Sequence, residues 1–154
     1  MTSFLPLTIE DQIAAMRRDW PTFALSRREG GNIVVWRGKV KPYNRPYVIE
    51  IFYSLDLVIA GPVVRVLFPA LTRLPGNAEG SLPHVYDRDT DPVLCLFDPA
   101  KREWDGWKEI SRTTVPWSID WLSCYEFWLM TGEWHGGGRH PPSSGDRFNV
   151  ESAA

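Results

Sequence analysis

Four strand-like segments in the first half of the chain constrain its fold most strongly. Each is rich in β-branched and aromatic residues, which favour strands, and turn-forming residues separate them. The segments are Phe23–Arg27, Asn32–Arg37, Pro46–Tyr53 and Pro62–Phe68. Because short links join consecutive segments, they predict a four-stranded antiparallel meander.

Helices are predicted before and after these strands. Thr8 can cap the N-terminus of a first helix, the Asp11 side chain can bond back to the cap residue, and Pro21 ends the helical pattern. Thr113 or Thr114 can cap a second helix, in which aromatic residues return at helical spacing until Gly132 stops it. The expected fold class is therefore α+β: an N-terminal helix, the meander, a loop that carries a cysteine, and a C-terminal helix.

Length and charge set further limits. The 154 residues suit a single domain, expected over residues 1–140, with a flexible tail at 141–154. The net charge of −2 gives no general attraction for nucleic acid or for an anionic membrane, and no apolar run has the length of a membrane span. The two cysteines and the absence of a secretory signal pattern predict a cytoplasmic protein with reduced thiols.

Cys95 is the candidate nucleophile. It lies between Leu94 and Leu96, in a stretch that Pro92 and Pro99 bracket, so the stretch is too short for a regular core strand. A free thiol has a pKa of about 8.5 and is a few per cent thiolate near neutral pH, which suffices for acyl exchange. His84 and backbone N–H groups of the loop could stabilise an oxyanion. A buried, inert thiol is the alternative interpretation.

A family resemblance favours the reactive interpretation. His84, a loop and Leu94-Cys95-Leu96 resemble the active-site segment of the ubiquitin-conjugating enzymes, in which a His-Pro-Asn motif precedes a catalytic Cys-Leu. Strands upstream and tryptophans downstream agree in order, so the resemblance covers roughly Gly31 to Gly132. It implies the ubiquitin-conjugating (UBC) fold and a thioester on Cys95.

Departures from that family narrow the resemblance. Val85-Tyr86 stand where the family has Pro-Asn, and glycine-rich and proline-rich sequence follows Thr131 in place of further helices. These features resemble the bacterial ubiquitin-conjugating-like proteins of anti-phage CBASS operons. The resemblance implies that a cGAS-like nucleotidyltransferase is the partner and that its C-terminus passes through the thioester to an amine. An activating enzyme would be a separate protein.

Assisting roles can be assigned around Cys95. His84 and the loop amides would stabilise the oxyanion, while Asp98 or Tyr86 would position the attacking amine. Asp98 is preferred to Asp105 because it follows the thiol by three residues. No cofactor or metal is expected.

Other interpretations remain open. The chain could be a non-catalytic UBC-fold binding module that scaffolds or regulates its partner, or a Cys-His hydrolase. Zinc is poorly supported, because the cysteines and histidines lack paired close spacing. Cys124 is interpreted as a packing residue, the loop Leu74–Ser81 could control access to Cys95, and Trp134-His135 could clasp a bound peptide.

Overall fold

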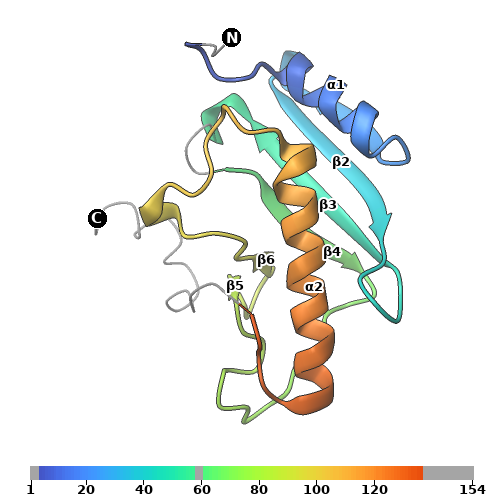
Figure 1. Ribbon diagram of the computed structural model, residues 1–154, viewed down its shortest axis with the longest axis vertical. Helices are drawn as coiled ribbons and strands as arrows, with labels where there is room; N and C mark the ends of the chain where they lie inside the picture. Colours follow the sequence, from blue (N-terminus) through green and yellow to red (C-terminus); the bar gives the residue numbers. More distant parts are fainter. Residues whose placement is uncertain (1–3, 58–60, 137–154) are drawn as a thin grey trace.

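The computed structural model describes residues 4–57 and 61–136 (Figure 1). The predicted tail at 141–154 lies outside the described residues. The helices are α1 (Ile9–Asp19) and α2 (Thr114–Thr131), and the strands are β1 (Ala24–Arg28), β2 (Ile33–Val40), β3 (Tyr47–Ser54), β4 (Val63–Phe68), β5 (Val85–Tyr86) and β6 (Val93–Leu94). Four 3₁₀ turns are interspersed, η1 (Glu29–Gly31), η2 (Leu55–Leu57), η3 (Pro99–Lys101) and η4 (Ile110–Arg112).

Strands β1 to β4 form one sheet in sequence order, and every neighbouring pair is antiparallel. The predicted meander is confirmed. Side chains on β3 alternate between the two faces, so Ile49 and Ile51 are buried while Glu50 and Phe52 are partly exposed. The buried face of the sheet meets α2, which crosses in front of it in Figure 1.

Helix α1 begins with the predicted capping box. The Asp11 backbone N–H donates to Thr8 Oγ1, and the Thr8 N–H donates to the Asp11 carboxylate, each at 3.0 Å. The fully buried Gln12 side chain then joins α1 to the segment before α2. Its amide donates to the Lys108 carbonyl oxygen and accepts from the Ile110 N–H, each at 2.9 Å. These bonds fix α1 against the segment that leads into α2.

Helix α2 supplies the largest part of the core beside the sheet. Thr113 is its N-cap residue, but the Thr113 hydroxyl donates back to the Glu109 carbonyl oxygen at 2.8 Å and accepts from the Trp104 indole at 3.0 Å. The predicted side-chain cap is therefore wrong, because Trp104 and Glu109 engage that hydroxyl instead. Gly132 ends the helix with a left-handed φ of 78°, as predicted.

The long connection between β4 and β5 is bonded to the second half of α2. The Asn77 amide donates to the Gly132 carbonyl oxygen at 2.8 Å and accepts from the Trp128 indole at 3.2 Å. The Thr72 N–H donates to the Tyr125 hydroxyl at 2.6 Å. The loop Leu74–Ser81 is thus packed onto α2, and its predicted control of access to Cys95 stays a prediction. Neither helix within residues 4–57 and 61–136 has the length and apolar character to cross a membrane.

Candidate functional site

The short hairpin of β5 and β6 brings His84 and Cys95 together. Val85 pairs with Leu94 and Tyr86 with Val93, so His84 just precedes one strand and Cys95 just follows the other. The Cys95 N–H donates to the His84 carbonyl oxygen at 3.0 Å. His84 and Asp87 adopt left-handed φ angles of 56° and 51°, which non-glycine residues rarely do. The hairpin therefore holds His84 and Cys95 in contact through an uncommon backbone geometry.

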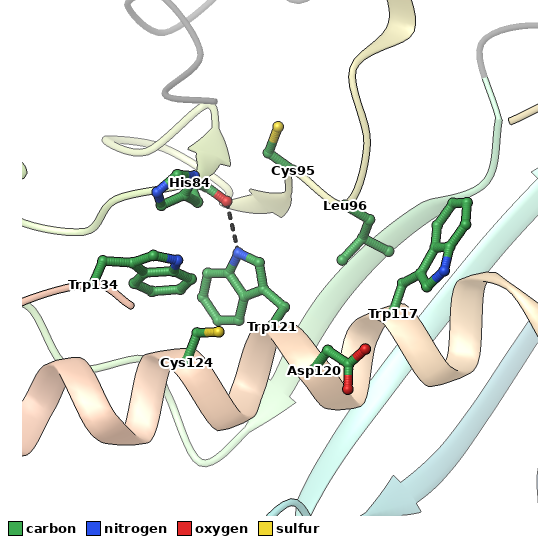
Figure 2. Close-up of a pocket in the computed structure, with 8 residues that line it drawn as sticks. All are labelled: His84, Cys95, Leu96, Trp117, Asp120, Trp121, Cys124 and Trp134. Atoms are coloured by element: carbon green, nitrogen blue, oxygen red, sulfur yellow. Dashed lines mark hydrogen bonds between the residues drawn. The ribbon is translucent and has the colours of Figure 1, made fainter. Parts of the chain in front are cut away.

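The Cys95 side chain lies in a small apolar cluster. Its sulfur lies 3.6 Å from the Tyr86 hydroxyl oxygen and 3.7 Å from the Phe97 carbonyl oxygen, and either oxygen can accept its single proton. Val63 and Val93 pack in the same cluster. Cys95 is 8% exposed, so it is more covered than the sequence predicted. Figure 2 shows the sulfur turned away from α2.

His84 is held through both its backbone and its ring. Its carbonyl oxygen accepts a second bond, from the Trp121 indole N–H at 2.8 Å. Its ring lies against the Trp134 ring, with 4.7 Å between ring centroids. Since Trp121 lies on α2 and Trp134 follows α2, these two indoles join the hairpin to the C-terminal part of the described chain.

A pocket of about 150 Å³ lies between the hairpin, α2 and the segment after α2 (Figure 2). Its lining consists of His84, Cys95, Leu96, Trp117, Asp120, Trp121, Cys124 and Trp134. The predicted pair His84 and Cys95 is thus joined by residues that sequence reasoning did not assign to the site. Trp117, Trp121 and Cys124 are spaced by four and three residues, so a helix places them on one face. That spacing was the signal available in the sequence.

The second thiol of the pocket, Cys124, has a raised pKa. Burial is the main cause, because it disfavours the thiolate, and the negative charge of Asp120 adds to it. The Cys124 sulfur also donates to the His135 carbonyl oxygen at 3.5 Å. Cys124 therefore lines the pocket, but its surroundings favour the neutral thiol.

The two remaining predicted residues lie in different places. Tyr86 contacts the Cys95 sulfur, as described above. Asp98 is outside the set that lines the pocket, and its carboxylate accepts from the Ala100 N–H at 3.0 Å, which places it at the start of the η3 turn. Asp120 is the carboxylate that does line the pocket.

The described residues contain no group of three or more histidine, cysteine or acidic side chains that could hold a metal ion. His140, one of the histidines considered as a zinc ligand, lies outside the described ranges.

Comparison with known proteins adds one finding. A family model described as Type II CBASS E2 protein matches residues 12–141. The comparison with curated proteins gave no significant match. The matched range includes the sheet, the cysteine hairpin, α2 and every residue that lines the pocket.

Proposed function

The chain belongs to the family of Type II CBASS E2 proteins, which gives it a role in CBASS defence, and from this premise we propose that Cys95 is its acyl carrier. In this proposal Cys95 accepts the C-terminus of a partner protein as a thioester and passes it to an amine. The partner is a cGAS-like nucleotidyltransferase, and the reaction takes place in the cytoplasm, where thiols stay reduced.

The observation that carries the proposal is the hairpin geometry around the sulfur. The Cys95 N–H donates to the His84 carbonyl oxygen, and the Tyr86 hydroxyl lies 3.6 Å from the Cys95 sulfur. A hydroxyl can donate as well as accept, so Tyr86 can stabilise the thiolate once the thiol has lost its proton. The hairpin thus supplies a nucleophile and a donor for its charged form.

Two bond exchanges make up the reaction. The Cys95 thiolate attacks the activated C-terminal carbonyl carbon, a C–S bond forms, and the activating group leaves. An amine then attacks the same carbon, a C–N bond forms, the C–S bond breaks, and the sulfur regains a proton. His84 and the loop amides would stabilise the oxyanion in both steps.

The attacking amine needs a carboxylate to orient it and take its proton. Asp120 is a further candidate, because it is exposed and lines the pocket that Cys95 also lines. Asp98, which the sequence favoured, binds the Ala100 N–H and keeps this role only as a prediction. The donor C-terminus is activated by a separate enzyme, or the reaction proceeds without one.

Incubation with the nucleotidyltransferase encoded beside the gene tests this function. We expect a covalent adduct on a non-reducing gel, which reductant removes and which Cys95→Ala abolishes. Cys124→Ala is the matched control, since it removes the other thiol of the same pocket and should keep the adduct. An adduct that persists in Cys95→Ala would contradict the proposal.

The low exposure of Cys95 favours one second candidate, a binding module that holds the partner without chemistry. In that case the partner would bind wild type and Cys95→Ala equally well, and no adduct would form even with an activating enzyme present.

A further inference from the structure

The size and walls of the pocket beside Cys95 suit one apolar side chain. Its volume is about 150 Å³. In another protein, an engineered apolar cavity of that order binds benzene. The walls are the indoles of Trp117, Trp121 and Trp134 together with Leu96. A ring or a branched aliphatic chain would fill this space.

Two polar groups of these walls already have partners. The Trp121 indole N–H donates to the His84 carbonyl oxygen, and the Cys124 sulfur donates to the His135 carbonyl oxygen. A polar ligand would lose its water on entering and could not accept a hydrogen bond from either of these two groups. The charged group in the lining is Asp120, which is exposed and would repel an acidic ligand.

Packing behind the walls holds the pocket open in this shape. Trp121 stacks on Tyr125 with 5.6 Å between ring centroids, and Trp134 packs against both His84 and Trp128. Gly136 lies so close to Cys124 that a Cβ atom there would come within 2.5 Å of the sulfur. Because the walls need little rearrangement, a ligand would bind a largely formed site.

We propose that this pocket binds the side chain of the penultimate residue of the donor C-terminus and selects donors in which that residue is large and apolar. The inference rests on the proposed thioester at Cys95. Cys95 lines the pocket while its sulfur points away from α2 (Figure 2). The last donor residue would lie at the sulfur, and one extended residue spans up to about 3.6 Å. A large side chain on the preceding residue is therefore long enough to turn back past Cys95 into the pocket that Cys95 lines.

Synthetic peptide thioesters test this selection without an activating enzyme. The peptides end in Xaa-Gly joined to a small thiol, with Gly, Leu, Phe or Asp as Xaa. In the exchange, the C–S bond to the small thiol breaks, a C–S bond to Cys95 forms, and the proton of Cys95 passes to the departing thiolate. Intact-protein mass measures the loading rate. We expect the Leu and Phe peptides to load about tenfold faster than the Gly peptide at subsaturating concentration, and the Asp peptide to load more slowly than Gly.

Variants of the pocket residues test whether the pocket selects the donor side chain. Leu96→Trp fills the space and Trp134→Ala removes a wall, so each should bring the Phe to Gly ratio close to one. Two opposite changes are used so that a folding defect in one does not decide the result. Trp107→Ala is the matched control, because Trp107 is 48% exposed and is not among the pocket residues. It should leave the ratio at the wild-type value.

The outcomes distinguish failure of the pocket assignment from failure of the proposed carrier function of Cys95. Equal loading of all four peptides onto Cys95 would overturn the pocket assignment and still support the carrier. Absence of any loading onto Cys95 would overturn the carrier and the pocket assignment together. If Trp134→Ala and Leu96→Trp both kept the wild-type loading ratio, the pocket would not select the donor side chain and the inference would be wrong.

Discussion

Cys95 and Cys124 line the same pocket, but the surroundings of the two thiols differ. Cys95 follows a two-residue strand, and its sulfur contacts a tyrosine hydroxyl and a backbone carbonyl. Cys124 lies within α2, where burial and the charge of Asp120 raise the pKa of its thiol. A thiolate at Cys95 would have a hydroxyl to donate to it, whereas a thiolate at Cys124 would face a carboxylate. The comparison indicates that local donors and charges, more than position in the pocket, decide which thiol can serve as a nucleophile.

Removing each thiol in turn should have the largest and most unequal effect. Cys95→Ala should abolish adduct formation with a peptide thioester, because the alanine has no nucleophile to offer. Cys124→Ala should retain loading within about twofold, since a partly buried thiol next to a carboxylate contributes little thiolate. Intact-protein mass after a timed reaction measures both. Equal losses in the two variants would contradict a difference in reactivity between Cys95 and Cys124.

Tyr86→Phe should slow acyl loading onto Cys95. The phenyl ring keeps the packing in the small apolar cluster but loses the hydroxyl that lies 3.6 Å from the sulfur. Hydrogen bonds to charged groups contribute about 1.5–3 kcal/mol, so we expect loading to slow by about tenfold or more. Rates of thioester exchange at neutral pH measure the effect. A rate equal to that of wild type would show that Tyr86 does not assist the thiolate.

Trp121→Phe tests the bond that connects α2 to His84. The change removes the indole N–H that donates to the His84 carbonyl oxygen, and we expect a loss of about 1 kcal/mol in the free energy of unfolding. Loading should also slow several-fold, because the same carbonyl oxygen orients Cys95. Trp117→Phe is the control, since Trp117 lines the pocket but makes no hydrogen bond to His84 within the described residues. Denaturant titration measures stability, and similar losses in both variants would contradict this role.

The smallest expected effect is a shift in the pH profile of Cys124, which Asp120→Asn should produce in a Cys95→Ala background, where no acyl transfer takes place. The Asp120 carboxylate disfavours the Cys124 thiolate, so its removal should lower the pKa of Cys124 toward the ordinary value. Alkylation of Cys124 in a Cys95→Ala background would then rise at lower pH than with Asp120 present. Burial still acts on the thiol, so the shift is partial. A profile that moved to higher pH would contradict the electrostatic assignment.

Much of the fold was predictable because its helices and strands follow from local sequence patterns. The β-branched runs predicted all four strands of the sheet, and Thr8 with Asp11 predicted the capping box. Local pattern could not show that the Thr113 hydroxyl would bond to Glu109 and Trp104, because that choice depends on where Trp104 packs.

The site was only partly predictable for the same reason. A hairpin of two short strands, β5 and β6, joins His84 to Cys95, and the family resemblance singled out that pair. Asp120, Cys124 and Trp134 reach the pocket because α2 and the segment after it pack against the hairpin. Chain distance favoured Asp98, whose carboxylate accepts from the Ala100 N–H at the start of η3, and its assisting role stays a prediction.

Peptide mapping of the adduct in wild-type protein, with both thiols present, tests the central claim most directly. The protein is loaded with its nucleotidyltransferase partner or with a peptide thioester, digested at low pH and analysed by tandem mass spectrometry. We predict that the acyl group is found on the peptide that contains Cys95, and that a thiol reductant removes it by exchange. An acyl group on the peptide that contains Cys124, with Cys95 unmodified, would rule out Cys95 as the acyl carrier.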